Sequence, residues 1–330
     1  MLVTVFSGAI LVGTALLCLP AATQGPGGAD PLTALFTATS ATCVTGLIVE
    51  DTPTYWSGFG QGVILALIQV GGFGIMTMTS LLIIVVSRRI GLRQRLVAQA
   101  ESGAVEIGDV RRILRGVAWF TIGFESAAAV VLAARFAIGY EEPLGRAVYL
   151  GVFHAVSSFN NAGFALFSDS LTDYGTDPWI MVTVTLAFVF GGLGFPVLLE
   201  LRSRPREPKR WSVHTKLTLA TTGVLFVVGI VLITAFEWTN PGTLGPLDLG
   251  EKLARGSFSG MTPRTVGFHV LDYGEMTEPS LLVTIVLMFI GGGSASTAGG
   301  IKVTTFALLA FVIYSELRGE PEVTLFRRRS

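Results

Sequence analysis

The sequence predicts an all-α integral membrane protein built from repeated helix–pore-loop–helix units. Three observations favour this class. Of the 330 residues, 51% are hydrophobic and only 14% are charged, whereas roughly 25% are charged in an average soluble domain. The mean hydropathy is +0.64, and the apolar residues gather in stretches long enough to cross a bilayer, which takes about 20 residues. Finally, one arrangement of spans and glycines occurs three times along the chain.

The composition also excludes several other classes of protein. The 23 basic and 23 acidic residues give a formal net charge of zero, whereas a nucleic-acid-binding chain is normally basic. Two cysteines, Cys18 and Cys43, are too few for a disulfide framework or a structural zinc site. No Ser–His–Asp, Cys–His or paired-carboxylate pattern stands out. We therefore expect no enzymatic activity, no cofactor bound to this chain and no nucleic-acid partner.

Six stretches are long and apolar enough to be membrane spans. They cover residues 2–19, 62–86, 116–138, 179–199, 217–236 and 280–314. The sixth is too long for one span and is interrupted by glycines at 291–293 and 299–300. We therefore expect it to form two half-helices joined by a non-helical loop at membrane depth, which is tolerated only where protein or a water-filled cavity covers it.

The distribution of charge orients these spans. Basic residues gather at 88–115, where there are seven, at 202–216, where there are six, and in the tail from Arg318, where there are four. Such segments face the cytoplasm, so we expect a multi-pass protein of the cytoplasmic membrane. The opposite loops hold fourteen acidic and five basic residues. An acidic outer face can attract cations, while the positive-inside bias alone explains the basic face but not the acids.

An internal repeat divides the chain into three units. A phenylalanine precedes a glycine by 10, 10 and 9 residues at Gly46, Gly163 and Gly267, and paired glycines of a second span start 25, 28 and 24 residues later. The paired glycines alone are also typical of close helix packing. Each unit is a span, a short apolar segment, a glycine turn and a span. We expect the units at 1–92, at 93–208 with the cytoplasmic linker 88–115, and at 209–330 with the broken span.

The turn before each repeated glycine has the composition of a pore loop. A short helix that enters the membrane and returns as extended chain can aim carbonyls at a central axis, where they replace the hydration shell of a cation. Glycine reaches the backbone angles that this requires, and the absence of charged neighbours suits a monovalent cation. The candidate selectivity filter consists of Val44, Thr45, Gly46, Asn161, Ala162, Gly163, Thr265, Val266 and Gly267.

Four motifs carry a resemblance to a known family: TCVTGL at 42–47, FNNAGF at 159–164, TPRTVGF at 262–268 and GGGSASTAGGIKV at 291–303. Over essentially its whole length, the chain resembles the potassium-transporter superfamily that includes the bacterial Trk and Ktr membrane subunits and the plant high-affinity transporters. The resemblance implies uptake of K+ as the transported ion, and a gate under the filter. The gate residues it implies are Gly291, Gly292, Gly293, Ser294, Ser296, Thr297, Gly299, Gly300 and Lys302.

The resemblance also implies partners, namely a homodimer on a cytoplasmic ring of nucleotide-binding regulatory subunits, with any nucleotide bound by that ring. The segments 88–115 and 202–216 are candidate docking faces or plain topology signals. Gly46 favours potassium, because a serine at this position accompanies sodium transport in plant relatives. The alternatives are sodium or non-selective cation transport on the same scaffold, or an inactive fragment. An intramembrane hydrolase or a non-transporting scaffold has no supporting motif.

The chain departs from the family pattern in the number of its units. The family implies four units around one pseudo-fourfold pore, whereas only three are present before the sequence stops at Ser330. The fourth filter glycine is absent, and so is an arginine that the family carries in its final span. We therefore expect a truncated or fragmentary member rather than a threefold channel.

Three charged residues near the pore have open roles. Lys302 either acts in gating, by opposing ion passage or anchoring the loop, or extends to the cytoplasmic face. Glu125 is expected to pair with Lys302, with Arg115 or with a polar group of a neighbouring unit. Arg264 is expected to brace its pore loop through carbonyls or an acid such as Asp272, because a guanidinium on the axis would repel a permeant cation.

Overall fold

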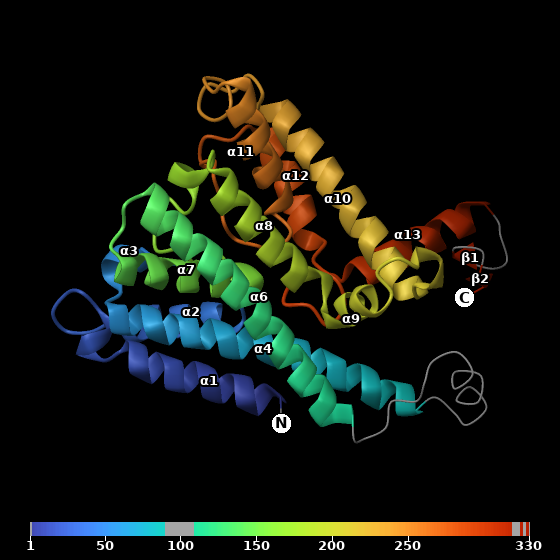
Figure 1. Cartoon of the computed structure of the whole chain (residues 1–330), viewed down its shortest axis with the longest axis horizontal. Coiled ribbons are helices and arrows are strands. Elements are labelled where there is room, and N and C mark those ends of the chain that lie inside the picture. The colour runs from blue at the N-terminus through green and yellow to red at the C-terminus, as the bar shows by residue number, and fades with distance from the viewer. Residues whose placement is uncertain (1, 90–108, 319–323, 326–327, 330) are drawn as a thin grey trace.

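Helices make up almost the whole structure (Figure 1), as the all-α prediction requires. The structure, a computed structural model, describes residues 2–89, 109–318, 324–325 and 328–329. Within these residues the strands are β1 (Thr324–Leu325) and β2 (Arg328–Arg329), which form a short antiparallel pair. The central part of the linker predicted at 88–115 lies outside the described residues.

The order of the elements repeats three times, as a long helix, a short helix, a glycine turn and a second long or broken helix. The first unit contains α1 (Leu2–Leu17), α2 (Pro31–Thr42), α3 (Thr52–Tyr55) and α4 (Gly58–Arg89). The second contains α6 (Asp109–Gly139), α7 (Leu144–Phe159), α8 (Pro178–Leu193) and α9 (Phe195–Ser203). The third contains α10 (Val213–Glu237), α11 (Leu249–Met261), α12 (Glu278–Phe289) and α13 (Val303–Arg318). The connections contain the 3-10 turns η1 (Pro20–Ala22), η2 (Thr172–Tyr174) and η3 (Pro208–Arg210).

The second unit lies between the other two. Figure 1 shows its green helices between the blue helices of the first unit and the orange and red helices of the third. The buried core follows this arrangement, because its largest cluster joins Ile64 and Ile68 of α4 to Phe153 and Phe188 of the second unit and to Phe258 of α11. The second unit therefore contributes to both interfaces between units.

Paired glycines bring the second spans against the ends of the short helices. A Cβ placed on Gly71 of α4 would lie 2.0 Å from the carbonyl oxygen of Thr42, and one on Gly191 of α8 would lie 1.8 Å from that of Phe159. No side chain fits at either position, which agrees with the packing interpretation of these glycines. The close approach places α4 and α8 directly beside the glycine turns that follow α2 and α7.

The fourth predicted span, at 179–199, is bent rather than continuous. α8 and α9 meet at 101°, whereas Gly58–Ser80, Leu114–Gly139 and Val213–Glu237 are uninterrupted helices with the length and hydropathy of membrane spans. Gly194 has a φ of +91°, which ends α8 and favours glycine. Pro196 follows in the first turn of α9, where its missing N–H is tolerated.

The sixth predicted span is broken, as the glycine density indicated. α12 ends at Phe289 and α13 begins at Val303. Between them, Ile290 and Ile301 form an isolated parallel bridge. The Gly291 N–H donates to the Ile301 carbonyl at 2.9 Å, and the Ile301 N–H donates to the Phe289 carbonyl at 3.0 Å. We refer to residues 290–302 as the intramembrane loop.

Several acids of the predicted outer loops have structural roles. Asp30, Asp177 and Asp248 accept hydrogen bonds from N–H groups in the first turns of α2, α8 and α11. Glu237, at the end of α10, is fully buried and accepts hydrogen bonds from two threonine hydroxyls and an asparagine amide. Attraction of cations therefore does not account for these four carboxylates, which satisfy backbone and side-chain donors instead.

Asp177 also joins α6 to α8. Its Oδ2 accepts a 2.6 Å hydrogen bond from Nε of Arg135 and a 3.0 Å bond from the Tyr140 hydroxyl. Its Oδ1 accepts from the N–H groups of Trp179 and Ile180 at the start of α8. Burial by itself raises the pKa of Asp177, but these hydrogen bonds outweigh it and hold the pKa below its usual value.

We expect replacement of Asp177 to destabilise the protein. Asp177→Ala removes a helix cap, which contributes about 1 kcal/mol, and also deprives Arg135 of its carboxylate. The free energy of unfolding should fall by about 2 kcal/mol in total. Asp177→Asn retains an oxygen that can cap α8 and should lose less. Thermal unfolding of the purified protein in detergent measures both effects, and equal losses would contradict this division between cap and ion pair.

The pH dependence of stability provides the control for this prediction. Because the folded pKa of Asp177 is lowered, its carboxylate stabilises the fold above the unfolded pKa, and this contribution is lost as pH falls through the folded pKa. The wild-type chain should therefore lose stability on acidification more steeply than Asp177→Asn. Parallel curves would show that the ionised form contributes nothing.

Candidate functional site

The three candidate filter segments, 44–46, 161–163 and 265–267, share one unusual backbone conformation. The first residue of each, Val44, Asn161 or Thr265, has a φ of 56°, 56° or 64°. The glycines two positions later, Gly46, Gly163 and Gly267, have φ values of 78°, 71° and 86°. Left-handed residues are uncommon outside glycine and mark strained, functional backbone. Because the left-handed residues stand two positions apart, successive carbonyls of a segment can point toward one side, as a carbonyl-lined path requires.

A serine stabilises the first two filter segments in the same way. Ser40 of α2 donates its hydroxyl to the Leu47 carbonyl at 2.7 Å, and Ser157 of α7 donates to the Phe164 carbonyl at 2.7 Å. The carbonyls of these serines also accept from Thr45 and Ala162 N–H groups, each at 2.8 Å. Our sequence reasoning missed both serines. The sequence feature that could have revealed them is their shared position, six residues before Gly46 and Gly163.

The glycines of the three segments meet at one place. A Cβ on Gly46 would lie 2.4 Å from the Ala162 carbonyl oxygen, and a Cβ on Gly163 would lie 2.6 Å from Cα of Gly267. All three glycines line one cavity of about 120 Å³, together with Asp51, Thr52, Ser168, Ser170 and His269. Residues more than 100 positions apart in sequence thus form a common site, whose lining also includes hydroxyl and carboxylate groups.

The electrostatics of the site come from backbone groups. None of the nine filter residues carries a charged side chain. The helices α2 and α7 end two positions before their segments and α11 ends four positions before the third, so the negative ends of the helix dipoles lie near the site. Neutral carbonyl oxygens and helix C-termini together favour a cation without fixing it as strongly as a carboxylate ring would.

The intramembrane loop is hydrogen-bonded to the bend between α8 and α9. The Gly293 N–H donates to the Gly192 carbonyl at 2.8 Å, and the Thr297 N–H donates to the Gly191 carbonyl at 3.2 Å. In return, the Phe195 N–H donates to the Ala295 carbonyl at 3.2 Å. The two irregular segments therefore satisfy backbone groups that each leaves unpaired, which membrane depth requires.

The three hydroxyl groups of the intramembrane loop, on Ser294, Ser296 and Thr297, have different surroundings. Among these three, and within the described residues, Thr297 is the one that bonds a backbone carbonyl, and that carbonyl belongs to Phe159 of α7, at 3.1 Å. Ser294 pairs with the Thr304 hydroxyl at 3.2 Å, and Ser296 Oγ is buried without a hydrogen-bond partner among the described residues. The loop backbone itself is satisfied mainly by other backbone groups.

Lys302 and three glycines shape the end of the loop that leads into α13. The Lys302 ammonium is half-buried and donates to the Ala298 carbonyl at 2.6 Å, four residues earlier. Gly300 has a φ of +66°, and a Cβ on Gly291 would lie 1.6 Å from the Gly299 carbonyl oxygen. The loop is therefore compact, and the hydrogen bond from Lys302 to Ala298 joins two residues of the loop itself.

Arg264 braces the start of the intramembrane loop. Its guanidinium donates to the carbonyls of Gly291 at 2.5 Å, Ile290 at 3.4 Å and Thr222 at 3.5 Å, and it lies 4.9 Å from the centre of the Phe226 ring. The expected bracing through carbonyls is present, but the carbonyls belong to α10 and the loop, and Asp272 takes no part in these bonds. Arg264 binds the negative C-terminal end of α12.

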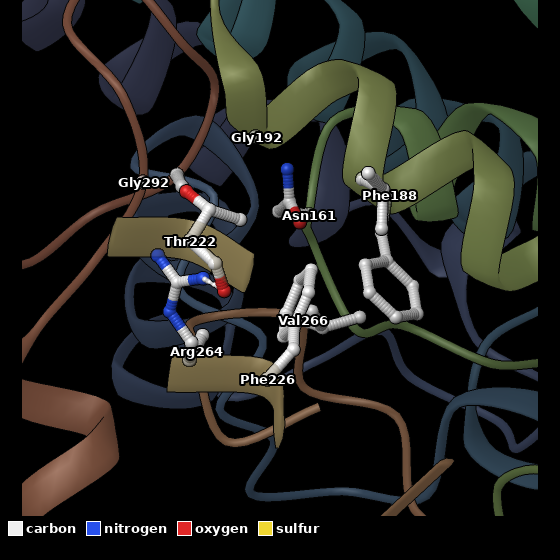
Figure 2. Close-up of a pocket in the computed structure, with 10 residues that line it drawn as sticks. Asn161, Phe188, Gly192, Thr222, Phe226, Arg264, Val266 and Gly292 are labelled. Atoms are coloured by element: carbon white, nitrogen blue, oxygen red, sulfur yellow. Dashed lines mark hydrogen bonds between the residues drawn. The ribbon is translucent and has the colours of Figure 1, made fainter. Parts of the chain in front are cut away.

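Figure 2 shows Arg264 beside Thr222 and Phe226, and Asn161 reaching into the same cavity from the second unit. This cavity encloses about 20 Å³, about the room that one water molecule needs. Its lining combines the filter residues Asn161 and Val266 with Gly292 of the intramembrane loop. Residues of the candidate filter and of the intramembrane loop therefore line the same cavity.

Glu125 is bonded to the end of the second short helix. Its Oε1 accepts a 2.9 Å hydrogen bond from Nδ2 of Asn160, which also donates to Oε1 of Gln69 at 3.2 Å. Asn160 belongs to the same unit as Glu125, and its amide links Glu125 to Gln69 of α4 in the neighbouring unit, while Lys302 bonds its own loop instead. The residue preceding the second filter segment is therefore tied to two units at once.

Comparison with known proteins places these features in a family. Residues 16–330 match the TrkH family, which is described as "Cation transport protein". The chain is 44% identical to the Ktr system potassium uptake protein B of Bacillus subtilis (strain 168), over 97% of this chain and 71% of that protein. It is 35% identical to the potassium/sodium uptake protein NtpJ of Enterococcus hirae, over 97% of this chain and 70% of that protein. The relatives are named as transport proteins, in line with the expectation of no enzymatic activity.

Among solved structures, the potassium transporter TrkH from Vibrio parahaemolyticus matches with a TM-score of 0.69 and 17% sequence identity. The match covers 97% of this chain and 64% of that chain, so this chain spans under two thirds of the solved protein. At this identity the likeness concerns the fold alone. The family match over nearly the whole sequence, together with this fold, shows that the chain belongs to the TrkH family of cation transport proteins.

Proposed function

We propose that this chain takes up potassium across the cytoplasmic membrane through a carbonyl-lined filter that the intramembrane loop gates. The observation that carries the proposal is the repeated filter backbone, with left-handed residues two positions apart in three segments whose glycines are in contact. The relatives named as potassium uptake proteins support the choice of ion. The membrane potential would drive entry with about 2.3 kcal/mol per charge per 100 mV.

Backbone oxygens of the three filter segments would coordinate the ion. K+ is cargo here, not a resident cofactor, and a neutral carbonyl site lets it leave as readily as it enters. The residues that we assign to coordination are Val44, Thr45, Gly46, Asn161, Ala162, Gly163, Thr265, Val266 and Gly267.

Transport of sodium or of several monovalent cations is the second candidate. The Enterococcus relative is named a potassium/sodium uptake protein, and it is 35% identical to this chain. Gly46 favours potassium in our proposal. Its Cα lies so close to the Ala162 carbonyl that any side chain would displace that oxygen, and the positions of such oxygens decide which ion fits.

The intramembrane loop is the proposed gate. Two observations support this proposal. Thr297 and Gly292 of the loop lie against the candidate filter, and Arg264 and Lys302 form hydrogen bonds near its two ends. Backbone at membrane depth can move only if other groups satisfy it in both positions. The gate residues that we assign are Gly291, Gly292, Gly293, Ser294, Ser296, Thr297, Gly299, Gly300 and Lys302.

We further propose that the chain works as a homodimer with a cytoplasmic, nucleotide-binding regulatory ring. The name of the Bacillus subtilis relative describes it as a protein of a Ktr system, which supports a partner subunit. The basic segment 202–216 offers a surface for it, since Arg204, Lys209 and Arg210 are exposed. Nucleotide would bind to the ring and not to this chain.

Expression in bacteria that lack potassium uptake tests the function, with Gly163→Ala as the filter variant. The wild-type chain should support growth at low potassium, and KCl should protect the purified protein against heat more than choline chloride does. Gly163→Ala should lower rubidium uptake by at least about tenfold, because its methyl group would lie 2.6 Å from Gly267 Cα, at a φ of +71°.

Gly123→Ala is the matched control for this variant, because Gly123 lies on α6 with nothing within 4 Å of an added Cβ. It should transport as the wild type does. If the wild-type chain gives neither growth nor protection by KCl, the potassium assignment is wrong.

Gly46→Ser should weaken the preference for potassium over sodium. The serine Cβ would lie 2.4 Å from the Ala162 carbonyl oxygen and force that oxygen to move. We expect a fall of roughly tenfold in the ratio of half-inhibiting Na+ to K+ concentrations in rubidium uptake, which corresponds to about 1.4 kcal/mol. An unchanged ratio would refute the role of Gly46, provided that Gly123→Ser behaves as the wild type.

Lys302→Ala should alter the opening of the gate. Removal of the ammonium breaks the 2.6 Å bond to the Ala298 carbonyl and takes a positive charge from the cytoplasmic end of the loop, so basal uptake should rise and regulation should weaken. Lys252→Ala removes a similar lysine–carbonyl bond, to Trp238 on the outer side at 3.1 Å, and serves as control. Unaltered uptake and regulation in Lys302→Ala would remove the residue from the mechanism.

A further inference from the structure

Thr297 of the intramembrane loop bonds the filter itself. Its hydroxyl accepts a 2.7 Å hydrogen bond from Nδ2 of Asn161 and donates a 3.1 Å bond to the carbonyl of Phe159. Asn161 and Thr297 are 3% and 2% exposed. Asn161 is the left-handed residue that opens the second filter segment. The bond therefore holds the side chain of a residue whose own backbone belongs to the filter.

The second unit fixes the place of the Thr297 hydroxyl. The Thr297 N–H bonds the Gly191 carbonyl, and a Cβ on Gly191 would lie 2.9 Å from Thr297 Oγ1. The hydroxyl thus lies between the glycine face of α8 and the end of α7. Its hydrogen is committed to Phe159, so its oxygen can only accept from Asn161.

The other two filter segments have no equivalent bond in the described structure. Val44, at the position of Asn161, has no side-chain group that can form a hydrogen bond. Thr265, at the same position in the third unit, has a buried hydroxyl without a hydrogen-bond partner among the residues the structure describes. The second segment is therefore the one whose leading side chain depends on the intramembrane loop.

We propose that Thr297 is a positioning residue for the filter, so that the intramembrane loop helps to set which ion passes as well as when ions pass. Asn161 precedes Ala162 and Gly163, and fixing its side chain fixes the direction of the carbonyls between them. The distinction between K+ and the smaller Na+ depends on those positions. This inference rests on the proposed function, because it gives a role in ion choice to the segment that we propose as the gate.

The consequence for gating is direct. When the loop leaves the filter, the Asn161 amide loses its acceptor, and a buried donor without a partner is costly. The second filter segment would then relax together with the loop. A filter released in this way should discriminate less well between K+ and Na+.

Thr297→Val and Thr297→Ser test the proposal. Valine preserves the shape of the side chain without its hydroxyl, and serine restores the hydroxyl. Two measurements apply to the full chain, namely inhibition of rubidium uptake by Na+ relative to K+, and the relative concentrations of NaCl and KCl that protect the purified protein against heat. Thr297→Val should lower the preference for K+ roughly 3- to 10-fold, the range expected for one hydrogen bond, and Thr297→Ser should stay near the wild type.

Thr284→Val on α12 is the matched control, because it removes a buried threonine hydroxyl that has no hydrogen-bond partner among the described residues. It should leave the preference unchanged. A wild-type preference in Thr297→Val, or an equal loss in Thr297→Ser, would overturn the proposal. If Thr297→Val fails to fold while Thr284→Val folds, the bond serves folding, and the proposal is wrong. If the wild-type chain neither transports K+ nor is protected by it, the proposed function is wrong, and this outcome is distinct from a failure of the Thr297 variants alone.

Discussion

Every peptide group at membrane depth must find its hydrogen-bond partner inside the protein, and the rest of this structure depends on that constraint. The chain leaves the helical conformation at three filter turns, at the bend between α8 and α9 and in the intramembrane loop. Serine hydroxyls donate hydrogen bonds to backbone carbonyls of the first two turns, and Arg264 donates to the carbonyls at the end of α12. The bend and the intramembrane loop form backbone hydrogen bonds with each other. Since lipid is as apolar as a protein core, these polar partners specify the arrangement more than apolar burial does.

The sequence predicted the parts of this arrangement that glycine marks. Filter turns need left-handed backbone, which leaves a glycine at a fixed distance from a span, and the sixth span carries too many glycines to stay helical. The bend at Gly194 was not predicted, because its glycine follows a pair that also serves helix packing. Nor did the sequence identify Asn160 as the partner of Glu125, since that depends on how α6 packs against the end of α7. The assignment of ion coordination and gating to particular residues remains a prediction.

The second unit holds the other two through adjacent residues that reach in opposite directions. Asn160 extends to Gln69 of the first unit, and Asn161 extends to Thr297 of the third. Glu125 anchors the first of these contacts from within the second unit. Positions that match in the repeat therefore make different contacts in the folded chain, and substitutions at Asn160 and at Asn161 would affect different neighbouring units. The motif FNNAGF shows two polar residues there, but only the fold shows that they point apart.

Arg264 and Lys302 share a property that is separate from bracing. Each is a cation in the protein interior whose hydrogen bonds go to carbonyl oxygens rather than to a carboxylate. Carbonyl oxygens can also replace the hydration shell of an alkali ion, and here three of them bond Arg264 and one bonds Lys302. These tethered charges would compete with mobile cations for the same oxygens. Among the described residues, no lysine or arginine bonds a carbonyl of the nine candidate filter residues, so the ion coordination that we propose there would meet no such competitor.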